Sequence, residues 1–130
     1  MLDDGIGTTA ALVVRGEILR RTGEDARATE ALVSGLAAAS ESGFDRVAGE
    51  ALRQLGLIDY LAGRLRAADE RFEQALSLAE RVGDRRGAGW ALQHLAWNAT
   101  TRGDYGEAER RLTAAADVFA GLDDDGGLSW

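Results

Sequence analysis

The sequence of 130 residues contains no proline, no cysteine and no lysine, and it has one histidine. Without cysteine, neither a disulfide framework nor a thiolate metal site is possible. Without proline, the strongest breaker of helix interiors is absent, which favours long helices. No stretch approaches the roughly 20 apolar residues needed to span a bilayer, and the first residues lack the pattern of a signal peptide. We therefore expect a soluble, cytoplasmic protein.

The charge balance is acidic, with 22 acidic against 15 basic residues and a net charge of -7 at pH 7. This balance disfavours the broad basic surface that a phosphate backbone requires, so nucleic acid is not expected as a direct partner. All the basic residues are arginine, and alanine and glycine are frequent, which indicates a GC-rich genome more than a function. The hydrophobic content of 45% is sufficient for one core.

A repeat of forty residues organises the chain. Leu12, Leu52 and Leu92 are separated by this period, and other small and apolar residues follow the same offset. The other sets are Ala11, Ala51 and Ala91; Gly23, Gly63 and Gly103; and Ala28, Ala68 and Ala108. A fixed period of this length is typical of a solenoid, in which each unit buries its apolar face only by stacking on its neighbours. The function of such a chain lies in a surface.

Each unit is predicted to be a helical hairpin. In the second unit, apolar residues recur at helical spacing on both sides of Gly63, a residue suited to the left-handed conformation that ends a helix. Asp45, Asp84 and Asp104 are candidate helix caps, and Glu107 stands three residues after Asp104, as in a capping box. The six predicted helices span residues 8–22, 25–42, 45–62, 65–82, 85–102 and 105–122.

The chain divides into three repeats with a fragment at each end. The repeats span 8–44, 45–83 and 84–122, residues 1–7 match the tail of a preceding repeat, and residues 123–130 match the start of a further one. Asp123 to Asp125 are then expected to form a solvated turn between repeats. We expect the natural protein to continue in at least one direction. End repeats that expose apolar faces also favour self-association.

The second and third units share one order of bulky, small and aromatic residues. In the second unit these are Leu52, Leu55, Gly56, Tyr60, Gly63, Leu65, Ala68, Phe72 and Ala75. In the third they are Leu92, Leu95, Ala96, Gly103, Tyr105, Ala108, Leu112 and Ala115. This order resembles the signature of the tetratricopeptide repeat family. The resemblance implies an all-α, right-handed superhelical solenoid, with close helix crossings at Gly56 and Ala68 and with Phe72 and Leu112 in the core.

Some positions depart from the family pattern. The period is longer than the 34 residues usual for the family, and in this respect the chain resembles arrays in kinesin light chains, large bacterial signalling ATPases and transcriptional regulators. In the first unit, Arg15 stands where Leu55 and Leu95 stand, and Asp25 also departs from the pattern, so this unit is partly exposed or packs against an upstream element. Asp59 occupies a place where the family often has an aromatic residue.

The resemblance also implies a binding surface, because tetratricopeptide arrays line a concave groove with the first helix of each hairpin. The corresponding residues are Val13, Glu17, Arg20, Arg53, Leu57, Tyr60, Gln93, Trp97 and Thr100. Among them, Trp97, Tyr60 and Arg53 are of the types enriched in interface hot spots. The alternative for Trp97 is packing between repeats, and packing is favoured for Trp90 and Trp130.

The expected function is non-catalytic binding of a protein or peptide segment, of amphipathic or arginine-containing character, within a larger bacterial regulatory protein. Val13 and Glu17 disfavour the family's carboxylate clamp for chaperone tails. The alternative is a sensory array in which a small effector binds the groove and shifts another domain. A lone His94 makes neither a metal site nor a catalytic triad, and no nucleophile, base and orienting group come together, so we expect no enzyme activity, metal or cofactor.

Overall fold

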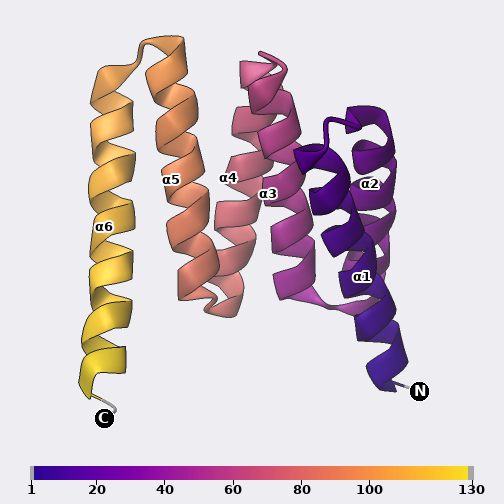
Figure 1. Cartoon of the computed structure of the whole chain (residues 1–130). Helices are drawn as coiled ribbons and strands as arrows, with labels where there is room; N and C mark the ends of the chain where they lie inside the picture. The colour runs from indigo at the N-terminus through magenta and orange to yellow at the C-terminus, as the bar shows by residue number, and fades with distance from the viewer. Residues whose placement is uncertain (1, 129–130) are drawn as a thin grey trace.

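The computed structural model describes the backbone of residues 2–128 and the side-chain surroundings of residues 5–123. Within that range the chain forms helices and short turns, with no strand (Figure 1). The helices are α1 (Leu2–Arg21), α2 (Asp25–Ser42), α3 (Asp45–Leu61), α4 (Leu65–Val82), α5 (Arg85–Arg102) and α6 (Tyr105–Leu128). The predicted all-α hairpin array is confirmed.

The helices reverse direction in turns of two or three residues, each built on one glycine. Gly23, Gly43, Gly63, Gly83 and Gly103 have φ angles between 74° and 85°, a region that residues with a side chain rarely adopt. The residue after each glycine donates its N–H to a carbonyl five residues back, as Arg64 does to Asp59 at 2.8 Å and Asp104 does to Ala99 at 2.9 Å. These bonds satisfy carbonyls that the helix end leaves free.

Two of the three predicted helix caps are present. Asp84 Oδ1 accepts the N–H of Gly87 at 3.0 Å, and Asp104 Oδ1 accepts the N–H of Glu107 at 3.2 Å. The prediction for Asp45 was wrong, because the helix already begins at that residue and Phe44 takes the cap position without a side-chain bond. Only half of the capping box forms, since the Asp104 N–H is taken by the turn described above.

The outer ends of the first and last helices were predicted wrongly. The first begins at Leu2 instead of residue 8, and the last continues to Leu128 instead of ending at 122. Asp123 to Asp125 therefore lie within α6 and do not form a turn. A glycine inside a helix lowers the stability of that helix by only about 1 kcal/mol, which does not by itself end the helix. In this chain a glycine ends a helix only where the chain turns back onto a neighbouring helix.

The helices form two layers, as their contacts show. Each helix packs against the next one along the chain, and in addition α1 contacts α3 and α3 contacts α5. The first helices of the hairpins therefore share one layer, while α2, α4 and α6 pack against these first helices and, among the described residues, not against one another. Alanine and leucine fill the space between the layers in two core clusters, which Leu36 joins. This arrangement leaves one long surface along α1, α3 and α5.

Close helix contact in the second repeat depends on Gly56. Phe72 is 1% exposed, and its ring lies where a Cβ on Gly56 would stand, so that any side chain there would overlap the ring. Leu32 fills the same place beside Gly16 in the first repeat. The prediction that Gly56 and Ala68 allow close crossings is confirmed, since Ala68 is also fully buried.

The prediction that Leu112 belongs to the core was wrong. Leu112 holds the position of Phe72 in the third repeat, yet it is 47% exposed. Phe72 is covered by the first helix of the following hairpin, where the ring of His94 lies 5.2 Å from its own. Among the described residues no helix covers the corresponding side of α6. Burial at this position therefore depends on a neighbouring hairpin.

The departures in the first two repeats lie at the surface. Arg15 and Asp25 are exposed, so their charges carry no desolvation cost. Asp59, the unexpected acidic residue, accepts a hydrogen bond from Arg64 Nε at 2.8 Å across the turn between α3 and α4. Such an exposed pair contributes at most about 1 kcal/mol.

A pair of substitutions tests the contact between Gly56 and Phe72. Gly56→Ala is expected to destabilise the protein by about 1–2 kcal/mol, because crowding of the ring outweighs the gain in helix propensity. Adding Phe72→Leu to Gly56→Ala recreates the Ala96–Leu112 combination of the third repeat and should recover part of the loss. Urea unfolding of the three proteins measures both effects. A stabilised Gly56→Ala variant would contradict the steric argument.

Candidate functional site

Two tryptophans stand on the open face of α5. Trp90 and Trp97 are seven residues apart, which places them on the same side of a helix about two turns from each other. They are 42% and 40% exposed. Trp90 also rests edge-on against Phe119 of α6, with ring centroids 5.4 Å apart. Each ring thus has one side packed and the other available to a ligand.

His94 lies between the two tryptophans on α5, and its ring packs against both of theirs. It is 8% exposed, and its ring centroid is 5.1 Å from that of Trp97 and 6.4 Å from that of Trp90. The pKa of His94 is lowered from 6.5 to about 4, mainly by burial and in addition by the positive charges of Arg53 and Arg20. The imidazole is therefore neutral at pH 7.

A basic hollow lies where α3 and α5 begin. Its volume is about 270 Å³. The lining residues are Arg46, Glu50, Arg53, Asp84, Arg86, Gly87 and Trp90. Residue 87 is a glycine, so Arg53 can lie against the first turn of α5. A Cβ atom on residue 87 would be 3.2 Å from Nη1 of Arg53.

The charges in this hollow are only partly balanced. Burial lowers the pKa of Arg53, while Glu50 and Asp84 act in the opposite direction, and the guanidinium remains charged at any physiological pH. Asp84 is engaged as the cap of α5 and lies 3.8 Å from Arg46. Positive charge therefore remains available for a ligand.

Hydrogen bonds hold the first helices in a fixed relation. Arg20 Nε donates to Gln54 Oε1 at 2.7 Å and so joins α1 to α3. Tyr60 and Thr101 share a hydrogen bond of 3.0 Å between their hydroxyls, which joins α3 to α5. Deeper in the array, Asn98 Nδ2 donates to the carbonyl of Leu65 at 2.9 Å. The surface is thus fixed before any ligand binds, which lowers the entropy cost of binding.

Comparison with known families agrees with this architecture. The family model for the tetratricopeptide repeat matches residues 47–120. The chain belongs to the tetratricopeptide repeat family. A search of curated proteins found no match to the chain. Tetratricopeptide repeats are generally non-catalytic scaffolds that mediate protein–protein interaction, and they typically bind proteins or peptides.

Eight of the nine tetratricopeptide groove positions predicted from the sequence are at least partly accessible. The exception is Val13, which is buried against the closely packed α2 and cannot contact a ligand. Leu57 packs partly into the core, and Glu17 forms an ion pair of 2.9 Å with Arg21. Thr100 is exposed, although its hydroxyl donates to the carbonyl of Ala96. The remaining accessible positions are Arg20, Arg53, Tyr60, Gln93 and Trp97.

Three residues of the tetratricopeptide surface were not predicted from the sequence. Arg46, Arg86 and Trp90 line the basic hollow. The packing favoured for Trp90 is also present, because its ring contacts Phe119 of α6, although the side chain stays 42% exposed. The spacing of seven residues between Trp90 and Trp97 was a signal that both face the same way. Each of the two arginines precedes the first predicted groove position of its helix by two turns, and only the packing of α3 against α5 brings them to one place. Trp130 lies outside the described residues.

The described residues offer little for other kinds of chemistry. Within residues 5–123, no three histidine or acidic side chains are grouped to hold a metal ion. No described helix has the length and apolar character needed to cross a membrane. The face formed by α1, α3 and α5 is the strongest candidate for a binding site.

Proposed function

We propose that this chain is a non-catalytic module that holds a segment of a partner protein on the face formed by α1, α3 and α5. The observation that carries the proposal is the pair Trp90 and Trp97, each about two-fifths exposed, with Trp90 lining the same hollow as the charged Arg53. Tryptophan and arginine are the residues that most often dominate binding energy at protein interfaces. On a rigid face, their contact area is gained at low entropy cost.

The charge pattern indicates the character of the segment. The α5 helix contains Arg85, Arg86 and Arg102 and no acidic residue, although the whole chain has a net charge of -7. An amphipathic segment with an apolar side chain against the tryptophans and a carboxylate near Arg53 fits this pattern. Glu17 of α1 already pairs with Arg21, so a basic side chain farther along the same segment would share or compete for that carboxylate.

We place the module in a larger bacterial regulatory protein of the cytoplasm. The resemblance of its forty-residue period to the arrays of large bacterial signalling ATPases and transcriptional regulators supports this context. The arginine-only basic composition supports a bacterial source. Binding on the concave face then brings a partner to the regulator without any catalytic step in the array itself.

Peptide selection tests this function. Peptides are selected from a displayed random library on the immobilised chain, and their Kd is measured by calorimetry for wild type, Trp97→Ala and Arg53→Gln. We expect Trp97→Ala to raise Kd by roughly 30-fold, equivalent to about 2 kcal/mol, and Arg53→Gln by roughly 10-fold. Thermal unfolding of each variant checks that the array remains folded.

The control is Tyr105→Ala, which removes a highly exposed aromatic residue from α6, outside the concave face. It should leave Kd unchanged. Equal losses for Tyr105→Ala and Trp97→Ala would sink the assignment of the groove. If no peptide is selected, while a small anion raises the melting temperature of wild type but not of Arg53→Gln, the array is an effector sensor instead.

A further inference from the structure

Arg53 carries a charge that no neighbouring side chain pairs with directly. The residue is half-buried on α3, and Glu50 and Asp84 are near enough to affect its pKa. No residue that the structure describes, however, forms a hydrogen bond or an ion pair with Arg53. Withdrawing a charge from water without pairing it is costly. The guanidinium therefore favours an anion that a bound partner supplies.

The surroundings of this guanidinium are adapted to it. A Cβ atom on Gly87 would be 3.2 Å from Nη1 of Arg53, so the glycine leaves the space that the guanidinium fills. The pair at the equivalent positions one repeat earlier is Val13 and Val47. The arginine and the glycine opposite it thus replace two apolar residues together. Because Gly87 precedes Trp90 by three residues, the charge lies about one turn before Trp90 along α5.

The two exposed tryptophans restrict the direction of a bound segment. Trp90 and Trp97 lie on the same helix and are seven residues apart, a rise of about 10.5 Å along its axis. The ring of His94 packs against both of theirs and so makes the surface between them continuous. A segment that crosses the layer of first helices meets only one of the two rings. A segment that lies along α5 meets both.

The spacing of the tryptophans fits a helical segment. In an extended segment, side chains on one side recur about every 6.6 Å, so residues that share a side are about 6.6 or 13 Å apart. Neither value matches the rise of about 10.5 Å between the tryptophans. In an α-helix, residues i and i+7 share a face and are separated by about 10.5 Å. A helix parallel to the axis of α5 therefore brings one apolar side chain to each ring.

The charged end of this surface lies within the array. Trp90 lines one hollow together with Arg46 and Arg53 of α3. The polar residue equivalent to His94 in the second repeat is Gln54, which bonds to Arg20 of the preceding first helix. The hollow is thus built from two adjacent hairpins and does not depend on the outer ends of the array.

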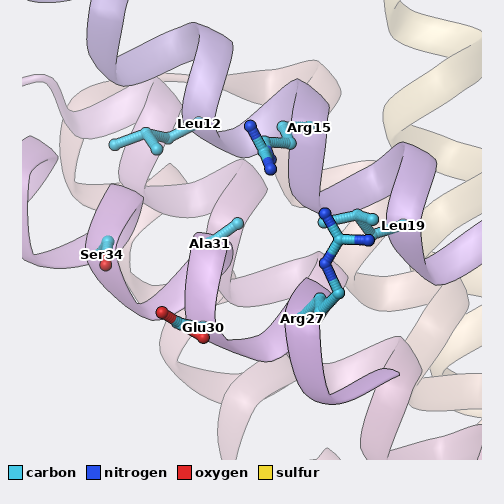
Figure 2. A pocket seen from close by; sticks show the side chains of 7 residues that line it. All are labelled: Leu12, Arg15, Leu19, Arg27, Glu30, Ala31 and Ser34. Carbon is cyan, nitrogen blue, oxygen red and sulfur yellow. The ribbon is translucent and has the colours of Figure 1, made fainter. Parts of the chain in front are cut away.

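A second hollow lined by arginines lacks these features. Figure 2 shows a hollow of about 280 Å³ between α1 and α2, with Arg15 and Arg27 in its lining. Arg27 is already paired with Glu24 at 2.7 Å, and the lining includes no aromatic residue. Of these two hollows, only the one between α3 and α5 combines an unpaired guanidinium with exposed aromatic surface.

We propose that the bound partner segment is an α-helix lying along α5. Two of its apolar side chains, seven residues apart, contact Trp90 and Trp97. An acidic side chain about one turn beyond the residue at Trp90 pairs with Arg53, and Arg46 and Arg86 in the same hollow add to the attraction. This inference rests on the proposed function, because it takes the face of α5 as the place where a partner segment binds.

Double-mutant cycles between protein and peptide test the conformation. The probes are peptides of about 16 residues, long enough for four helical turns, selected on the immobilised chain from a random library. Each peptide residue is changed to alanine, and Kd is measured on wild type, Trp90→Ala and Trp97→Ala. One peptide residue should couple to each tryptophan, with losses that depart from additivity by roughly fivefold or more. These two residues should be seven apart.

An extended segment gives a different count. Over the same distance of about 10.5 Å its coupled residues would be about three apart, and that result overturns the proposal. The cycle with Arg53→Gln should couple to an acidic residue three or four positions beyond the one at Trp90. Coupling only to residues on the Trp97 side overturns the assignment of the charged end. Tyr105→Ala, outside this face, is the control and should couple to no peptide residue.

A proline substitution in the peptide gives an independent measurement. Proline is placed between the two coupled residues, at a position that shows no coupling of its own. It should raise Kd roughly 100-fold, because proline breaks a helix interior. Alanine at the same position is the matched control and should leave Kd nearly unchanged. Equal affinity of the proline and alanine peptides overturns the helical conformation.

Failure of this inference is distinguishable from failure of the proposed function. A library that yields no peptide dependent on Trp97 overturns both. A peptide that depends on Trp97 but has coupled residues about three apart, or accepts the proline, leaves the binding function in place and overturns the helix alone. Thermal unfolding of each protein variant verifies that the array remains folded.

Discussion

Phe72→Ala is expected to lower the free energy of unfolding by about 3–5 kcal/mol, the range for removing a buried aromatic side chain. Phe72 is almost fully buried between α3, α4 and α5 and touches both the backbone at Gly56 and the ring of His94. Because Gly56 has no side chain, the α3 position directly opposite the ring has no side-chain atoms to occupy the space. Urea or guanidinium unfolding at pH 7 measures the loss.

The equivalent residue of the third repeat provides the comparison. Leu112→Ala should cost about 1 kcal/mol or less, because half of that side chain is already in water. Similar losses at positions 72 and 112 would contradict the view that a following hairpin is needed to bury this position.

Acidification is expected to destabilise the protein through His94. The pKa of His94 is about 4 in the folded chain, below the ordinary value of 6.5, because the ring is buried and two arginines lie near it. The unfolded chain therefore binds a proton more readily as the pH falls from 6.5 to 4. The stability that His94 contributes is complete above pH 6.5. It decreases by about 2 kcal/mol at pH 5 and by about 3 kcal/mol at pH 4.

His94→Gln isolates this effect, since glutamine occupies the same position in the second repeat as Gln54. Carboxylates that titrate below pH 5 are common to both proteins, so their contribution cancels in the difference between wild type and variant. Unfolding free energies are measured from pH 7 to pH 4. Relative to His94→Gln, the wild type should lose about 2 kcal/mol at pH 5 and about 3 kcal/mol at pH 4. A difference that does not change with pH would show that His94 is accessible to protons in the folded chain.

The same histidine connects stability with the proposed binding face. The ring of His94 packs against the ring of Trp97, and the ring of Trp90 also lies next to it. A charged imidazole there would have to be hydrated, which would disturb the packing that orients both rings. Peptide affinity should therefore fall over the same pH range as stability in the wild type, and less so in His94→Gln.

The helical hairpins were predictable from the sequence because their signals are local. The forty-residue period, the apolar spacing of 3.6 and the turn glycines gave the four inner helices to within one residue. The caps at Asp84 and Asp104 followed from the same short-range patterns. The outer ends of α1 and α6 were not predictable in this way, because the chain does not turn back onto a neighbouring helix at the glycines there.

The binding face was only partly predictable for a different reason. Helical spacing placed Arg53, Tyr60 and Trp97 on one side, but it could not show that Val13 is drawn into the core by the close approach of α2. Nor could it show that Arg86 and Arg53, from different hairpins, line one hollow. Such facts depend on the distance between helices. That distance is determined by side chains that are far apart in the sequence.

By itself, the sequence determined the class of fold, the number of repeats, the places where helices reverse and the family to which the chain belongs. All of these follow from backbone preferences and from a pattern that repeats along one chain. Only the tertiary structure decided which equivalent positions are buried, as the contrast between Phe72 and Leu112 shows. A residue in a solenoid is buried by its neighbouring repeat, so its environment depends on what stacks against it and not on its own local sequence.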